Sequence, residues 1–80
     1  MYIMRIKEVR ESRFLSARAL AERAGLPKTT VTEAEKPNAN PTIKTLVKIA
    51  QILHCKIDDL VEIKFVDGIP SENIDYSENL

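Results

Sequence analysis

Residues 16–36 read SARALAERAGLPKTTVTEAEK, and this stretch decides the fold. Ser16 offers an N-cap hydroxyl to the segment that follows it. Gly25 supplies the left-handed backbone that the end of a helix prefers. The pattern predicts a helix of about two turns over residues 17–24. The apolar positions of this helix are Leu20, Ala21 and Ala24.

A second short helix is expected directly after the first. Pro27 cannot continue the first helix but suits the first turn of another. We expect this second helix to span residues 28–36, because Val31 and Ala34 share a face and Pro37 ends it. Two short helices joined by a tight turn that contains glycine form the helix-turn-helix signature.

Helical patterns lie on both sides of this motif. Before it, Ile3, Ile6 and Val9 share one face and predict a helix over residues 3–12. After it, Thr42 is a good N-cap for a helix over residues 43–53. The apolar stripe of that helix consists of Ile43, Leu46, Val47, Ala50 and Leu53.

A last short helix is expected over residues 58–61, led by Ile57. Between the long helix and this one, we expect His54 to tolerate a left-handed backbone and Cys55 to be a small buried hydrophobe. A catalytic pair of these two residues is the remote alternative, because adjacent side chains rarely point at each other. The sequence therefore predicts one all-α domain of five helices and no enzyme.

The composition excludes several other classes of protein. Eighty residues suffice for one domain, and only two glycines and a charged fraction of 30% favour helices over a sandwich of strands. One cysteine and one histidine make neither an internal disulfide nor a zinc site, so we expect no metal and no cofactor. No leader or membrane span is evident, and we expect a cytoplasmic protein with no membrane partner and no small-molecule ligand.

A net charge of zero hides an asymmetry between the two parts of the chain. Residues 1–50 carry ten Lys or Arg against five Glu, whereas residues 51–80 carry two Lys against seven acids. This separation favours a half that faces nucleic acid and an acidic tail, although ordinary solvated faces would give the same count.

From residue 6 to residue 61 the sequence resembles the helix-turn-helix domain of phage repressors, Cro proteins and the wider xenobiotic-response-element family. The resemblance implies the five-helix fold of the lambda repressor, with the motif at helices 2 and 3. The positions that carry it are Arg10, Leu15-Ser16, Leu20-Ala21-Glu22, Gly25-Leu26, Thr29-Thr30-Val31, Glu35, Pro41-Thr42, Leu46, Ala50, Leu53 and Ile57-Asp58-Asp59-Leu60.

In that family the second helix of the motif enters the major groove of double-stranded DNA, and residues of these types can read base edges or hold phosphates. The resemblance also implies a mostly buried ion pair between Arg10 and Glu35. A merely solvated helix face is the alternative to DNA readout. The expected base-reading residues are Lys28, Thr29, Thr32 and Glu33, and the expected phosphate contacts are Ser16, Arg18, Thr30, Lys36, Asn38, Asn40 and Thr42.

Three positions depart from the family pattern. Ala17 stands where a glutamine usually contacts DNA, so one familiar contact is lost. Phe14 replaces a small residue at the end of the first helix, which strains the backbone unless the ring is buried. Pro37 replaces the usual glycine after the recognition helix, and the following loop offers asparagines where basic residues are common.

The domain is expected to span residues 1–62, followed by an acidic tail over residues 63–80. Glu62-Ile63-Lys64-Phe65 alternates polar and apolar residues like a half-buried strand. This strand could pair with a second copy of the chain, or Ile63 and Phe65 could pack back on their own bundle. From about Ser71 onward we expect disorder.

The sequence thus favours a sequence-specific transcriptional regulator, most simply a repressor that binds a two-fold operator as a homodimer. The rival is a protein-interaction module on the same fold, such as an antitoxin-like or coactivator-like partner. Salt-dependent binding to DNA would separate the two, because phosphate contacts weaken as salt rises.

Overall fold

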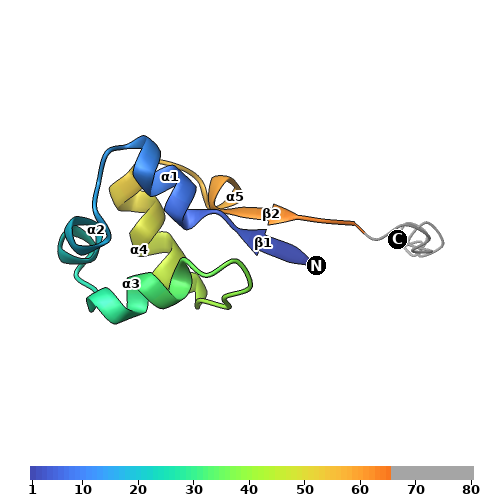
Figure 1. Ribbon diagram of the computed structural model, residues 1–80, viewed down its shortest axis with the longest axis horizontal. Helices are drawn as coiled ribbons and strands as arrows, with labels where there is room; N and C mark the ends of the chain where they lie inside the picture. The colour runs from blue at the N-terminus through green and yellow to red at the C-terminus, as the bar shows by residue number, and fades with distance from the viewer. Residues whose placement is uncertain (66–80) are drawn as a thin grey trace.

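The computed structural model describes residues 1–65, which form five helices and a small two-stranded sheet (Figure 1). The five helices of the sequence prediction are confirmed. The strand at Tyr2–Met4 is an addition to that prediction, and the strand at Val61–Ile63 overlaps the one expected over residues 62–65. In chain order the elements are β1 (Tyr2–Met4), α1 (Ile6–Ser12), α2 (Ala17–Ala24), α3 (Lys28–Ala34), α4 (Ile43–Leu53), α5 (Ile57–Leu60) and β2 (Val61–Ile63).

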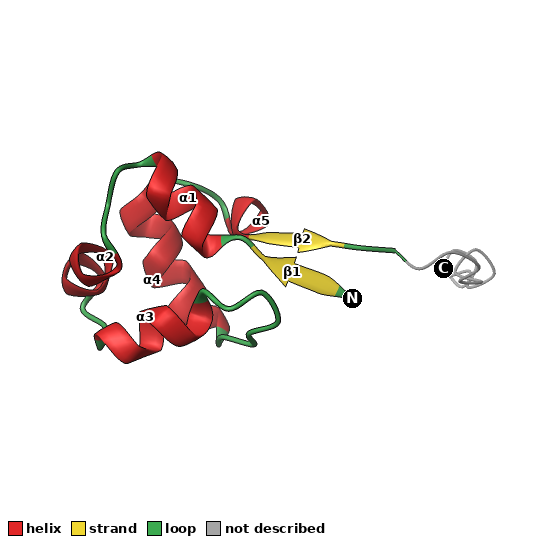
Figure 2. Ribbon diagram, viewed as in Figure 1, coloured by secondary structure: helices red, strands yellow, loops and turns green. Residues whose placement is uncertain are grey.

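One apolar core holds the helices together. Helix α4 packs against α2 and α5, while α2 and α3 contact each other as the two arms of the motif. Figure 2 shows the helices as one cluster, with the two strands extending from it side by side. The largest fully buried side chains are those of Ile6, Leu20, Val31, Ile49, Leu53 and Leu60.

The ends of the helices follow the predicted local chemistry. The hydroxyl of Ser16 accepts a hydrogen bond from the amide of Ala19 at the start of α2, and Thr42 does the same for Thr45 at the start of α4. Gly25 ends α2 with a φ of 70°. His54 ends α4 with a φ of 55°, as expected for a residue that tolerates the left-handed region.

The first predicted helix begins later than the sequence suggests. The spacing of Ile3 fits a helix, yet Tyr2–Met4 is a strand and α1 starts only at Ile6. β1 pairs antiparallel with β2, with Tyr2 opposite Ile63. This pairing joins the two ends of the domain, and such a long-range contact leaves no trace in local periodicity.

Two other helix boundaries shift by one or two residues. Helix α3 ends at Ala34 instead of Lys36, because the chain turns with hydrogen bonds from the amide of Lys36 to Glu33 and from that of Ala39 to Lys36. The last helix spans Ile57–Leu60, one residue earlier than expected.

The buried face of α4 is rotated from the predicted stripe. Ile43 is 66% exposed and Val47 is 38% exposed, although both were expected to face the core. Ile49, which the stripe omitted, is fully buried instead. The face that packs against the bundle is therefore Leu46, Ile49, Ala50 and Leu53, which has the same helical spacing.

Phe14 is strained in the way its position suggested. Its φ is 57°, in the left-handed region, and its side chain is 94% exposed. Burial of the ring therefore does not compensate for the backbone conformation at this turn, which reverses the chain between α1 and α2.

A strand is present after the last helix, at Val61–Ile63, but the two apolar side chains that could have packed back on the bundle do not. Ile63 is 63% exposed and Phe65 is 86% exposed, so that alternative is wrong. The strand pairs with β1 of its own chain. The expectation of disorder from Ser71 onward lies outside the described residues.

Candidate nucleic-acid interface

A buried ion pair fixes helix α3 to helix α1. The Nε of Arg10 donates to Oε2 of Glu35 over 2.6 Å, and its second guanidinium nitrogen contacts Oε1 over 3.3 Å. Both side chains are only 10% exposed. Arg10 also donates to the carbonyl of Leu15 over 2.8 Å, so one guanidinium joins α1, the following turn and the end of α3.

This arrangement leaves one face of α3 free for contact. Val31 and Ala34 are buried against the core. The four residues expected to read bases are all exposed: Lys28, Thr29, Thr32 and Glu33. The helix thus presents a short polar surface of mixed charge, and the Arg10–Glu35 ion pair fixes the position of the helix.

A groove runs between this helix and the loop that follows it. It encloses about 610 Å³ and is open to the surface. The groove brings together residues that the sequence assigned to two different tasks. Thr29, Thr30, Glu33 and Lys36 line it from α3 and the turn after it, and Asn38, Asn40 and Thr42 line it from the loop.

Thr32 faces a second hollow, between α3 and the start of α1. This hollow encloses about 470 Å³, and its lining includes Arg5, Lys7 and Lys36. The sequence gives no signal for Arg5 and Lys7 beyond their membership of the basic half of the chain. Arg5 forms ion pairs with Glu8 and Glu62. Lys7, in contrast, has no acidic partner in the described part of the chain.

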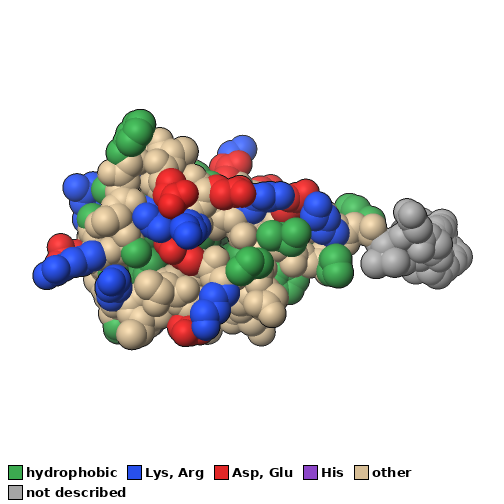
Figure 3. All heavy atoms as spheres, in the orientation of Figure 1, with side chains coloured by type: hydrophobic (Ala, Val, Ile, Leu, Met, Phe, Trp, Pro, Cys, Tyr) green, Lys and Arg blue, Asp and Glu red, His purple; other side chains and the backbone are tan. Residues whose placement is uncertain are grey.

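Glu33 on α3 forms an exposed ion pair with Lys36 in the turn that follows the helix. Nζ of Lys36 lies 3.2 Å from the carboxylate of Glu33, and the two side chains are 60% and 70% exposed. On α2, Arg18 likewise pairs with Glu22 over 3.4 Å. In the space-filling view, basic and acidic side chains are interspersed over the visible face (Figure 3).

Several of the expected phosphate contacts also have structural tasks. Ser16 and Thr42 use their hydroxyl oxygens to cap α2 and α4. Among the expected base-reading residues, Thr32 likewise donates its hydroxyl to the carbonyl of Thr29 over 3.1 Å. A ligand would therefore meet Ser16 and Thr42 together with the amide ends of their helices, which attract negative charge.

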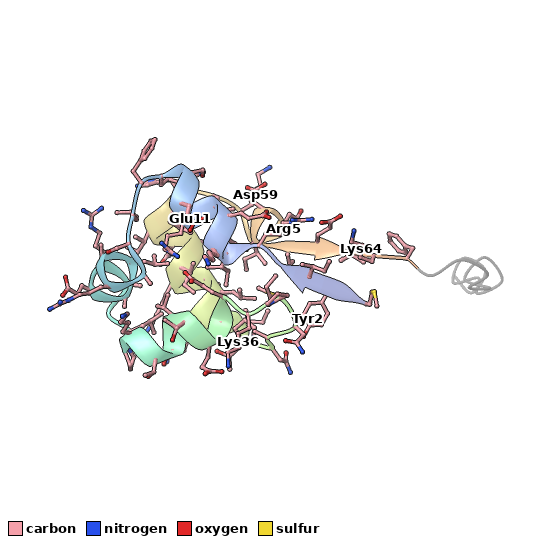
Figure 4. The ribbon with its side chains drawn as sticks, viewed as in Figure 1. Tyr2, Arg5, Glu11, Lys36, Asp59 and Lys64 are labelled. Atoms are coloured by element: carbon pink, nitrogen blue, oxygen red, sulfur yellow. The ribbon has the colours of Figure 1, made fainter. Side chains whose placement is uncertain are left out.

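Strand β1 holds the loop after α3, a role that the sequence did not reveal. The amide of Met4 donates to the carbonyl of Pro37 over 2.9 Å. The hydroxyl of Tyr2 donates to the carbonyl of Ala39 over 2.7 Å. Figure 4 shows Tyr2 and Lys36 on the same side of the molecule, beside this loop. The loop with Asn38 and Asn40 is thus tied at two points.

The structure offers little to support catalysis by His54 and Cys55. His54 is exposed at the end of α4, while Cys55 packs partly against the core. Burial, helped by the charge of Asp59 and opposed by Arg13, raises the pKa of the Cys55 thiol. A protonated thiol is a weak nucleophile. Within residues 1–65, no group of three or more His, Cys, Asp or Glu side chains could hold a metal ion.

Comparison with known proteins decides the family. The family model described as helix-turn-helix matches residues 6–60, which are most of the chain. The chain belongs to the helix-turn-helix family. Proteins with this motif place the second helix of the motif in the major groove of DNA, which corresponds to α3 here. The resemblance drawn from the sequence is therefore confirmed.

Two individual relatives agree with this assignment. An uncharacterized transcriptional regulator of helix-turn-helix type from Archaeoglobus fulgidus is 38% identical over 56 residues, which cover 70% of this chain and 79% of the relative. A crystal structure from Bacteroides fragilis, of a protein assigned provisionally to DNA binding, matches with a TM-score of 0.68 at 29% identity. It covers 78% of this chain, and the whole of that structure is matched.

No helix among residues 1–65 combines the length and apolar character that crossing a membrane requires.

Proposed function

We propose that this helix-turn-helix protein is a sequence-specific transcriptional regulator that represses by binding a two-fold operator in double-stranded DNA as a homodimer. We also propose a cytoplasmic location, because a transcriptional regulator must reach the DNA that it binds. The observation that supports the proposal best is the exposed polar face of α3, held from behind by the Arg10–Glu35 ion pair and flanked by the groove.

The contacts divide by their place on the motif. Lys28, Thr29, Thr32 and Glu33 read base edges, because they occupy the exposed side of the helix that enters the groove. Phosphates are held by the residues around them, which carry hydroxyl, amide or cationic groups. These are Ser16, Arg18, Thr30, Lys36, Asn38, Asn40 and Thr42.

The internal ion pairs shape this binding. Lys36 must leave Glu33, or share its charge with it, before it holds a phosphate at full strength. The same applies to Arg18 and Glu22. We therefore propose weak binding to random DNA, with discrimination supplied by Lys28 and Glu33.

Salt dependence of DNA binding tests the proposal. Affinity for a DNA duplex should fall steeply as salt rises, because bound phosphates release their counterions. Lys36→Ala should flatten this dependence by roughly one counterion, with similar losses on all sequences. The matched control is Lys56→Ala, which removes an exposed lysine at the start of α5, outside the motif.

A chain that binds no DNA at low salt would contradict the proposal. That result would favour the protein-interaction module instead, in which the face of α3 contacts another protein.

A further inference from the structure

The two strands differ in what lies along their outer edges. The outer edge of β1 is covered by the loop after α3, through the bond from the amide of Met4 to Pro37 and the bond from Tyr2 to Ala39. The outer edge of β2 has no partner among residues 1–65. An open strand edge presents unpaired amide and carbonyl groups and can pair with another strand.

The backbone of β2 directs particular residues to this open edge. The amide of Lys64 donates to the carbonyl of Met1 over 2.8 Å, and the amino group of Met1 lies 3.3 Å from the carbonyl of Lys64. Lys64 therefore faces β1. Successive residues of an antiparallel strand point their backbone amide and carbonyl groups to opposite sides. The backbone groups of Val61, Ile63 and Phe65 therefore point to the open edge.

The side chains at the same end are apolar and unusually exposed. Tyr2 lies opposite Ile63 in the sheet and shares its face, and the two are 40% and 63% exposed. Phe65, two residues farther along, is 86% exposed. Figure 3 shows hydrophobic side chains gathered at the strand end of the visible face. An open edge beside exposed apolar side chains is typical of an interface.

We propose that β2 pairs antiparallel with β2 of a second copy, with the two-fold axis at Ile63. This register places Ile63 opposite itself and Val61 opposite Phe65 of the second copy. It also places Glu62 opposite Lys64 of the second copy, and Lys64 opposite its Glu62. The pairing is self-complementary, as an interface with two-fold symmetry requires, and opposite charges directly across an antiparallel pair stabilise it.

Charge complementarity identifies the occupant as a second copy. Within one chain Nζ of Lys64 already lies 3.2 Å from Glu62, so the two-fold axis would place each carboxylate between two ammonium groups. A register shifted by two residues would lose the match of Glu62 with Lys64. The result is a four-stranded sheet in which β1 of each copy forms the outer strand.

This inference deepens the proposed function, because it supplies the interface of the proposed homodimer. A different apolar surface offers the rival interface: Ile43 and Val47 are exposed on α4. The two surfaces lie on different elements and can be tested separately in the full chain.

A mixing experiment tests the register. Glu62→Lys gives a chain with lysines at positions 62 and 64, and Lys64→Glu gives a chain with glutamates at both positions. Each variant alone would place like charges opposite each other and should dimerise more weakly than the wild type. In a mixture the unlike chains should pair with each other, with a preference on the order of tenfold over either homodimer.

Native mass spectrometry of the mixture provides the readout. The loss of the contacts of Glu62 with Arg5 and Lys64 within the chain is the same in homodimers and heterodimers, so it does not affect the preference. Statistical mixing of the two variants would overturn the proposed register.

A second variant tests the edge itself. Ile63→Pro removes an outward-facing amide while leaving the amides that bond β1, and proline is tolerated at sheet edges. We expect this variant to sediment as a monomer with an unchanged helical spectrum. The matched control, Ile43→Ser, removes an exposed isoleucine from α4 and should remain a dimer.

The failure of this inference is distinguishable from that of the proposed function. Three results would overturn the strand interface: an Ile63→Pro chain that stays dimeric, an Ile43→Ser chain that becomes monomeric, or a wild-type chain that sediments as a monomer at every protein concentration measured. In each case salt-dependent binding of the chain to DNA would still be measured independently.

Discussion

Two ion pairs on helix α3 and its C-terminal turn contain the same kinds of charge in very different surroundings. Glu35 and Arg10 are each 10% exposed and lie 2.6 Å apart. Glu33 and Lys36 are 70% and 60% exposed and lie 3.2 Å apart. Only one residue, Ala34, separates the two glutamates along the chain.

The comparison shows that burial, and not the type of residue, distinguishes a glutamate that stabilises the fold from one that is free to contact a ligand. A buried pair cannot lose one member without leaving a charge in the core. An exposed pair contributes little to stability, and water or a ligand can replace either partner. Glu35 therefore fixes the position of α3, while Glu33 remains available to DNA.

The largest expected effect concerns the buried pair. Arg10→Met should lower the free energy of unfolding by on the order of 3 kcal/mol, because Glu35 would stay buried without its partner. The double variant Arg10→Met/Glu35→Leu should recover much of this loss. Denaturant titrations of the two variants measure the difference. If both unfold at the same denaturant concentration, well below that of the wild type, the pair does not have the proposed role.

A smaller effect is expected at the edge of the groove. Thr42→Ala should lower the free energy of unfolding by about 1 kcal/mol, because the amide of Thr45 loses its capping oxygen. Thr42→Ser keeps the oxygen and should restore most of the stability. Thermal unfolding of the three proteins checks this. Equal stabilities for Thr42→Ala and the wild type would contradict a stabilising role of the Thr42 cap and would leave its hydroxyl available for DNA only.

The smallest effect on stability is expected for the exposed pair. Glu33→Gln should change the free energy of unfolding by less than about 0.5 kcal/mol, because both side chains are well solvated. It should at the same time preserve or raise affinity for random DNA, since it frees Lys36 and removes a negative charge. Denaturant titration and binding to a random duplex give the two readouts. A loss of stability like that of Arg10→Met would end the distinction between the two pairs.

The parts of the molecule that local chemistry determines could be predicted from the sequence. Ser16, Gly25 and Thr42 marked helix ends because their caps involve residues a few positions away. The identity of the motif followed from the same stretch. The exposed face of α3 could be predicted because Val31 and Ala34 marked the buried one.

The parts of the molecule that depend on distant contacts could not be predicted from the sequence. β1 exists because it pairs with β2 at the other end of the domain, so Ile3 gave a misleading helical spacing. The rotation of α4 depends on the surface it packs against, which decided between Ile49 and Val47.

The central claim is that the exposed face of α3 reads DNA sequence, and a selection of bound sequences from random DNA tests it most directly. The selection would compare the wild type with Lys28→Ala and Glu33→Gln. Lys28→Ala should lose about 1 to 3 kcal/mol of binding free energy on the preferred site only, and Glu33→Gln should relax the preference at one base pair. An unaltered sequence preference in both variants would contradict the claim.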